Sequence, residues 1–239
     1  MASAGTGQIA VETRGLGKRY GRNWALRGLS IQIPAGQSVC LLGPNGSGKS
    51  TLLRILATSA RPTTGQVMVF RADAVKDGDS VRARVGFLSH RTFLYGELTA
   101  LENLQFAAGM YGLHEDVATL HRLLDDVGLG QATHHRVRGF SQGMSQRLSL
   151  ARATLHSPSL LLLDEPYSAL DQGGLAALDR YFQGFKDSGG TAIVVTHQVE
   201  RGLAACERTI AIKSGQLVYD GPSSSFLSSP EAASIGDWA

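Results

Sequence analysis

GPNGSGKST, residues 43–51, is the segment that says most about the fold class of this chain. It follows an apolar, β-rich run, QSVCLLG at 37–43, and it opens a helical pattern, KSTLLRILA. In this context the spacing G-x-x-x-x-G-K-[ST] predicts a phosphate-binding loop, because glycines let backbone N–H groups point at phosphate oxygens and the helix N-terminus attracts negative charge. We expect Lys49 to reach the β- and γ-phosphates and Ser50 to ligate Mg²⁺. The nucleotide-contacting residues expected here are Gly43, Pro44, Asn45, Gly46, Ser47, Gly48, Lys49, Ser50 and Thr51.

Two later segments place polar side chains at strand ends. LLLLDEP at 160–166 predicts a strand buried on both faces, with Asp164 at its carboxyl end as a Mg²⁺ ligand. Glu165 follows as a candidate general base, although an acidic pair after a strand can also cap the next helix. GTAIVVTH at 190–197 predicts a neighbouring buried strand that ends in His197. Parallel strands bring these ends to one edge, so His197 is expected to contact the γ-phosphate or to hold Glu165.

The rest of the chain alternates between strand and helix patterns around a helical insert. Residues from about 92 to 158 are predicted to be helical, with one apolar face through Leu101 and Tyr111, another through Val117 and Val127, and a third helix from about Ser145. Short strands are predicted before the phosphate loop, and a hairpin, TIAIKSG with QLVYDG, after it. The fold class expected is α/β, with a core of mostly parallel sheet, an N-terminal antiparallel β subdomain and the helical insert.

Composition restricts the class of protein. Of the 239 residues, 43% are hydrophobic, which suffices for a packed core, and the two cysteines match no ligand or disulfide pattern. Cys40 is predicted to be a buried core thiol, and such cysteine usage fits a reducing compartment. No run approaches the roughly 18 to 20 apolar residues that span a bilayer. We therefore expect a cytoplasmic protein whose membrane role, if any, depends on partner subunits.

The net charge of +3 is unevenly distributed. Residues 1–91 carry 13 Lys and Arg against 4 Asp and Glu, whereas residues 92–239 carry 10 against 16. A basic nucleotide pocket explains part of this asymmetry, and head-to-tail association of basic and acidic halves is a second interpretation. No RNA- or DNA-binding motif accompanies the charge, so nucleic acid is not expected as a partner.

A small glycine-bearing turn, FSQGM at 140–144, has no catalytic side chain of its own. The order of phosphate loop, helical insert, FSQGM, LLLLDEP, SALD and histidine resembles the ATP-binding-cassette (ABC) ATPases over residues 8–222, leaving 223–239 as a Ser-rich tail in which Trp238 could dock. The family's usual signature is LSGGQ, so Phe140, Gln142 and Met144 depart from it. The resemblance implies an ATPase that uses ATP and Mg²⁺, with two subunits packed head to tail. It also implies that Ser141 and Gly143 face the γ-phosphate held by the other subunit.

Other roles follow from the same resemblance. Tyr20 resembles the aromatic residue that stacks on adenine, and Asp171 the residue that communicates between the two ATP sites. His90 stands where the family normally has a Gln that faces both Mg²⁺ and the membrane partner, and imidazole is the poorer Mg²⁺ ligand.

The resemblance also bears on function. It implies the ATPase subunit of a membrane transporter, held by integral permease subunits on the cytoplasmic face of the inner or plasma membrane. VGFLSHRTFLYGELTALENLQFAA, 85–108, resembles the haem-exporter ATPases of cytochrome c maturation, in which six residues also separate a His from ELTALENL. The signature FSQGM instead resembles exporters of drugs, polysaccharides or lipids. A soluble ABC ATPase without transport and a small-molecule phosphotransferase are further alternatives.

Overall fold

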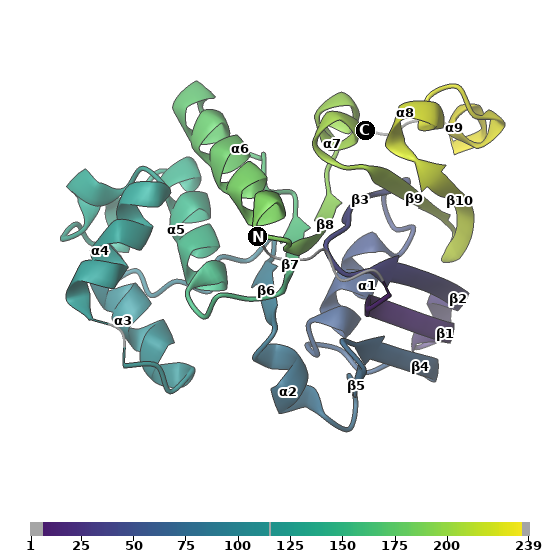
Figure 1. Cartoon of the computed structure of the whole chain (residues 1–239), viewed down its shortest axis with the longest axis horizontal. Helices are drawn as coiled ribbons and strands as arrows, with labels where there is room; N and C mark the ends of the chain where they lie inside the picture. Colours follow the sequence, from purple (N-terminus) through teal and green to yellow (C-terminus); the bar gives the residue numbers. More distant parts are fainter. Residues whose placement is uncertain (1–6, 115, 236–239) are drawn as a thin grey trace.

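The computed structural model describes residues 7–114 and 116–235, which contain two sheets with helices around them (Figure 1). The larger sheet has the strand order β10-β9-β3-β8-β7-β6, in which five strands are parallel and β10 is an antiparallel edge strand. The smaller sheet, β2-β1-β4-β5, is antiparallel. The expected fold class is therefore confirmed. The strands are β1 (Ile9–Tyr20), β2 (Asn23–Pro34), β3 (Ser38–Leu42), β4 (Thr64–Val69), β5 (Ala72–Asp73), β6 (Val85–Leu88), β7 (Leu160–Asp164), β8 (Thr191–Val195), β9 (Arg208–Lys213) and β10 (Gln216–Pro222).

Side chains of the central strands alternate between two apolar cores. In β7, Leu161 and Leu163 join the core that includes the helical insert, whereas Leu160 and Leu162 join the core shared with the antiparallel sheet. The two cores lie on opposite faces because successive side chains of a strand point to opposite sides. A strand covered on both sides reads as a continuous apolar run, which is why LLLL predicted this strand correctly. Cys40 is buried in the first core, as expected.

The two N-terminal strands are longer than the short segments expected from the sequence. Strands β1 and β2 each run for 12 residues, through glycines that were read as turn signals. Gly15 and Gly28 have φ of +57° and +67°, and the register between the strands shifts on both sides of Leu16. These glycines therefore mark bulges that bend paired strands and do not end them.

The helical insert contains α3 (Ala100–Met110), α4 (Val117–Asp126), two short 3₁₀ turns, η1 (Gly130–Ala132) and η2 (Val137–Gly139), and α5 (Gln142–Thr154). Two residues placed on buried faces are exposed. Val117 begins α4 and is 49% exposed, and Tyr111 lies beyond the end of α3 with its ring against His156. Helix α5 begins three residues before Ser145, because the Ser141 hydroxyl accepts the Met144 N–H and caps the helix there.

The remaining helices are α1 (Lys49–Leu56), α2 (Gly78–Arg82), α6 (Gln172–Asp187), α7 (Val199–Ala205), α8 (Ser223–Phe226) and α9 (Pro230–Ile235). The predicted hairpin of β9 and β10 is confirmed. Within the Ser-rich tail, α8 packs against α7 and β10, and Phe226 is fully buried beside Tyr219. A single aromatic anchor thus fixes a Ser-rich segment. Trp238 lies outside the described residues. Among the helices of the described part, none is long and apolar enough to span a bilayer.

Candidate nucleotide site

Four parallel strands deliver polar residues to one edge of the large sheet. The phosphate loop follows β3, His197 lies two residues beyond the end of β8, Asp164 ends β7, and His90 lies two residues beyond β6. The pairing of Asp164 with Val195, and of Leu88 with Leu163, aligns the ends of these neighbours. Together they surround a cleft of about 370 Å³. Its lining comprises Tyr20, Ala25, Asn45, Gly46, Ser47, Gly48, Lys49, Ser50, Thr51, His90, Asp164, Glu165, Val195 and His197.

The phosphate loop is a cradle that fits phosphate groups. Gly43 and Gly48 have φ of +147° and +111°, and a Cβ atom on them would collide with the carbonyl oxygens of Ile212 and Ala25. Only glycine fits this path of the backbone. The Lys49 ammonium donates to the carbonyl oxygens of Gly43 and Pro44, at 2.5 and 3.0 Å, which holds it across the loop. Burial lowers the pKa of Lys49, while the negative charges of Glu165 and Asp164 oppose that shift.

The metal side of the cleft offers hard oxygen donors. The Ser50 hydroxyl donates to Asp164 Oδ1 at 3.2 Å, and burial raises the pKa of Asp164 although that hydrogen bond and the positive charge of Arg54 act against it. No cluster of three or more His, Cys, Asp or Glu residues that could hold a metal is present in the described part of the chain. A hydroxyl and one carboxylate are a donor set that suits Mg²⁺ when the nucleotide's phosphates and water complete the shell.

Glu165 occupies a strained position beside this donor set. Its φ is +56°, a left-handed conformation that is rare for residues other than glycine. Carboxylate Oε2 accepts the backbone N–H of His197 at 3.1 Å, while Oε1 lies 3.4 Å from His197 Nε2 and accepts no hydrogen bond from a described residue. Burial raises the pKa of Glu165, and the contacts with His197 oppose the shift. A carboxylate with a raised pKa in the wall of the cleft suits a base that takes a proton from water.

The structure brings most of the expected residues together, but not all of them. Tyr20 lies in the cleft wall with its ring half-exposed, and Lys18 Nζ stands 4.9 Å from the ring centroid. Five of the expected residues do not line the cleft of their own chain: Gly43 and Pro44, which begin the phosphate loop, and three residues of other elements. Ser141 and Gly143 form the start of α5, and Asp171 caps α6 by accepting the Gly174 N–H at 2.8 Å.

Sequence reasoning missed Gln146. Its Nε2 donates to the Glu165 carbonyl oxygen at 3.1 Å, from a side chain that is only 8% exposed. The residue stands four positions before Leu150 and seven before Ala153, on the buried face of α5. A polar side chain on such a face needs a hydrogen-bond partner, and this pattern could have singled it out.

Comparison with known proteins adds the following. A family model described as "ABC transporter" matches residues 26–168. The chain is 36% identical to the ABC transporter ATP-binding protein NatA of Bacillus subtilis over 88% of this chain and 87% of that protein. It is 38% identical to the cytochrome c biogenesis ATP-binding export protein CcmA 2 of Cupriavidus metallidurans, over 79% and 89%. It is 33% identical to the daunorubicin/doxorubicin resistance ATP-binding protein DrrA of Streptomyces peucetius, over 92% and 67%.

Among solved structures, a dimeric ATP-binding cassette in a post-hydrolysis state bound to ADP and Pi superposes with a TM-score of 0.81 at 27% identity. The match covers 89% of this chain and 98% of that one.

Proposed function

Because this chain belongs to the ABC transporter family, we propose that it powers the export or delivery of haem for cytochrome c maturation. As a family member it is the ATP-binding subunit of an ABC transporter and hydrolyses ATP with Mg²⁺ as its cofactor. The proposal adds a cargo, a set of residue roles and a set of partners. In it, residues 8–222 act as one ATPase domain and 92–158 as its helical subdomain.

The residue roles follow from the cleft. Lys49 and the loop N–H groups bind the phosphates, Tyr20 stacks on the base, and Ser50 and Asp164 hold Mg²⁺, which when bound neutralises phosphate charge. Glu165 takes the proton of the attacking water. His197 holds the Glu165 carboxylate through its backbone N–H and donates from its ring toward the γ-phosphate. The observation that carries these roles is the convergence of all six side chains on one cleft.

Two copies complete the site in this proposal. Ser141 and Gly143 lie away from the cleft of their own chain, at the N-terminus of a helix, where a hydroxyl and a positive dipole end suit an anion. In a head-to-tail dimer they face the γ-phosphate bound by the other copy, and Asp171 lies at the contact between the two sites. The related cassette solved as a dimer supports this arrangement, and so does the opposite charge of the two halves of the chain.

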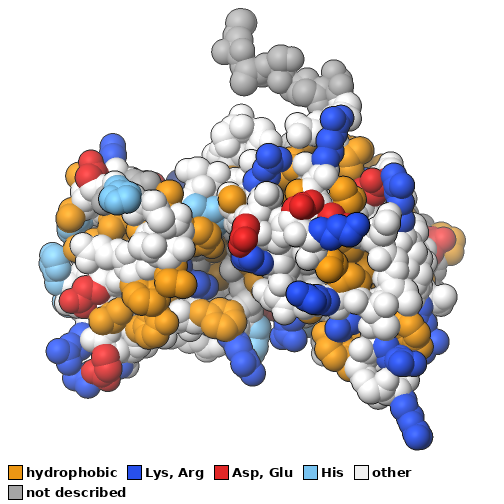
Figure 2. Space-filling model, turned by 90° about the horizontal axis from the view of Figure 1, so that it is seen from below, with side chains coloured by type: hydrophobic (Ala, Val, Ile, Leu, Met, Phe, Trp, Pro, Cys, Tyr) orange, Lys and Arg blue, Asp and Glu red, His pale blue; other side chains and the backbone are white. Residues whose placement is uncertain are grey.

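An exposed apolar surface on α3 and on the loop before it supports a permease partner. Phe93, Tyr95, Phe106 and Met110 are all exposed, Met110 by 74%, and the rings of Tyr95 and Phe106 pack edge to face at 4.8 Å. Figure 2 shows hydrophobic side chains gathered on the side of the molecule that holds the helical insert. Exposed aromatic and Met side chains are typical of protein contact sites. We therefore place the permease here, with the chain on the cytoplasmic side of the membrane.

The cargo is argued from the same surface. His90 lies in the wall of the nucleotide cleft and begins the loop that carries Phe93 and Tyr95, so it links ATP to the partner. The segment 85–108 resembles the haem-exporter ATPases, and CcmA 2 is among the relatives. His90 itself does not bind haem in this proposal, since a place beside Mg-ATP offers no apolar pocket. Drug export is the second candidate function. It is favoured by the similarity to DrrA and by Met144 in the signature.

The test of the cargo is deletion of the gene in its native host, followed by haem staining of periplasmic c-type cytochromes. We expect these cytochromes to be lost, and to return with the wild-type gene but not with Lys49→Ala. Normal c-type cytochromes together with altered resistance to drugs, or altered surface polysaccharide, would refute the haem proposal and establish the alternative.

A further inference from the structure

Helix α5 contacts the turn that follows β7 at two points. This turn comprises residues 165–169. Gln146 donates to the carbonyl oxygen of Glu165 at 3.1 Å. One turn earlier, a Cβ atom on Gly143 would lie 2.7 Å from the carbonyl oxygen of Ala169, so the helix backbone packs directly on that group. Glu165 and Ala169 have φ of +56° and +59°. Both contacts of α5 therefore fall on residues with left-handed backbone.

Two elements outside this turn, β8 and α5, hold the Glu165 backbone. Its N–H donates to the Val195 carbonyl at 2.9 Å, which fixes it to β8. Its carbonyl accepts from the Ser168 N–H and hydroxyl at 3.2 and 2.9 Å, but these donors belong to the same turn and move with it. Gln146 is the donor that reaches this carbonyl from a helix. A left-handed residue persists only where its surroundings hold it, so this contact bears on where the carboxylate points.

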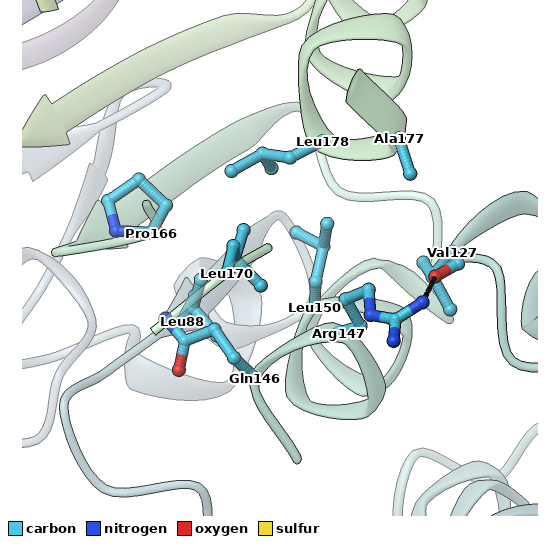
Figure 3. A pocket seen from close by; sticks show the side chains of 9 residues that line it. All are labelled: Leu88, Val127, Gln146, Arg147, Leu150, Pro166, Leu170, Ala177 and Leu178. Atoms are coloured by element: carbon cyan, nitrogen blue, oxygen red, sulfur yellow. Dashed lines mark hydrogen bonds between the residues drawn. The ribbon is translucent and has the colours of Figure 1, made fainter. Parts of the chain in front are cut away.

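The surroundings of Gln146 favour this one orientation of its amide. Figure 3 shows the residue beside a small cavity, of about 10 Å³, that lies between α5 and α6. Leu150, Leu170 and Leu178 line the cavity and offer no hydrogen-bond partner. An amide that turned toward them would lose its bond to Glu165 and gain none, so the side chain is held where it is.

We infer that Gln146 is a positioning residue for hydrolysis: it ties the Glu165 carbonyl to α5, so that the aim of the carboxylate depends on where α5 stands. The inference rests on the proposed role of Glu165 as the base. Because Ser141 caps the same helix, a shift at the N-terminus of α5 is transmitted through Gln146 to Glu165. ATP affinity does not depend on this link, since Gln146 does not line the nucleotide cleft.

The first test is Gln146→Met in the full-length chain, which keeps the length of the side chain and removes the N–H donor. We expect kcat for ATP hydrolysis to fall about 10-fold, because displacement of a catalytic group by a fraction of an ångström is costly. KM for ATP and the affinity for a fluorescent ATP analogue stay within about 2-fold of wild type, since only transition-state geometry changes. Gln131→Met, the same change at an exposed position, keeps full kcat. Unchanged kcat in Gln146→Met overturns the inference.

A second variant separates positioning from folding. In Gln146→Glu, a protonated carboxyl can donate to the Glu165 carbonyl, whereas an ionised one repels it. The kcat of the variant divided by that of wild type therefore rises as pH falls from about 8 to about 6, a range in which a buried carboxyl titrates. Taking the ratio at each pH removes the pH dependence that the two proteins share. A pH-independent ratio overturns the inference even if Gln146→Met fails to fold.

Failure of the proposed base is recognisable separately. If Glu165→Gln hydrolyses ATP at the wild-type rate, the role of Glu165 is wrong whatever Gln146 does. If Glu165→Gln is inactive and Gln146→Met is fully active, only the positioning role is wrong.

Discussion

Glu165 carries three properties that each oppose stability. Its side chain is only 21% exposed, its backbone is left-handed, and its Oε1 accepts no hydrogen bond from a described residue. Burial of a carboxylate raises its pKa, because the charged form loses its water. Residues that break local rules in this way concentrate at functional sites, where the strain serves the chemistry.

Replacing this carboxylate tests its role directly. Glu165→Gln keeps the size of the side chain and cannot accept a proton, so ATP turnover is expected to fall by about 10²- to 10⁴-fold while ATP still binds. Gel filtration with Mg-ATP is expected to show an accumulated dimer. The same change removes a poorly solvated charge, so the Tm without nucleotide is expected to rise at neutral pH. A monomeric mutant with full activity would contradict the assignment.

His156 is another partly buried titratable residue, and it lies outside the nucleotide cleft. Its Nε2 lies 3.1 Å from the Val85 carbonyl oxygen and its ring stacks on Tyr111 at 4.2 Å. Burial lowers the pKa of His156, with the Val85 hydrogen bond opposing the shift. The folded protein thus favours neutral imidazole, whereas the unfolded chain takes up a proton below its ordinary pKa of about 6.5. This contribution to stability is full above that pH. It is lost as the pH falls from there through the lowered pKa of His156 in the folded protein.

His156→Gln removes the titration and keeps a hydrogen-bonding side chain. Between about pH 7.5 and about pH 5.5, we expect the free energy of unfolding of wild type to fall more steeply than that of the variant. At pH 7.5 the variant itself is expected to be less stable by about 1 kcal/mol, from a weakened bond to Val85. Urea unfolding at both pH values measures the difference, and His114→Gln, at an exposed histidine, serves as the control. Parallel slopes would show that His156 does not carry the effect.

At the scale of elements, the start of α3 determines the shape of the apolar surface. Thr99 and Glu102 form a capping box, in which each side chain satisfies the other residue's N–H. Asn103, which is buried, accepts the Tyr95 N–H and donates to carbonyl oxygens in the loop, including those of Tyr95 and Thr99. One amide therefore fixes the loop that carries Tyr95, part of the surface proposed above for the permease.

Asn103→Ala leaves several of these loop groups without a partner. We expect a loss of about 1 to 3 kcal/mol in the free energy of unfolding, as for other buried polar groups left unsatisfied. Denaturant unfolding measures it. Gln105→Ala, at an exposed amide in the same helix, is expected to change stability by less than about 0.5 kcal/mol. Equal effects of the two changes would mean that Asn103 does not hold the loop.

In the molecule as a whole, one chain separates the nucleotide cleft from the start of α5. The cleft lies at the edge of the large sheet, and the start of α5 lies in the helical insert, which Figure 1 shows as a separate group of helices beside the sheets. Their separation is the physical reason to expect that two chains share each site.

A mixture of two inactive mutants tests this sharing. Lys49→Ala removes the phosphate contact, and Ser141→Arg blocks the opposing surface with a long side chain. A mixed dimer retains one site with both parts intact, so an equimolar mixture is expected to regain ATPase activity and ATP-dependent dimerisation that neither mutant shows alone. Analytical ultracentrifugation with Mg-ATP and a phosphate-release assay measure the two effects. Mixtures that behave as the sum of the pure mutants would exclude a shared site.

The class of fold and many residues of the cleft can be predicted from the sequence alone. Phosphate-loop glycines permit one backbone path, and doubly buried strands require continuous apolar runs such as LLLL, so both are visible as local patterns. The end of each parallel strand then predicts which polar residues meet, because topology brings these ends to one edge. Asp164, Glu165 and His197 were placed together on that basis, and the structure places them so.

The contacts that hold those residues become visible only in the tertiary structure. The bond from Gln146 to Glu165 joins residues 19 positions apart on a helix and a turn, and nothing local marks the pair. The same holds for the burial of Phe226 in a Ser-rich tail and for the exposure of Val117 at a helix start. Local patterns report the backbone conformation that a segment can adopt and which face is apolar. Contacts between segments depend on how those faces pack, which is a property of the whole chain.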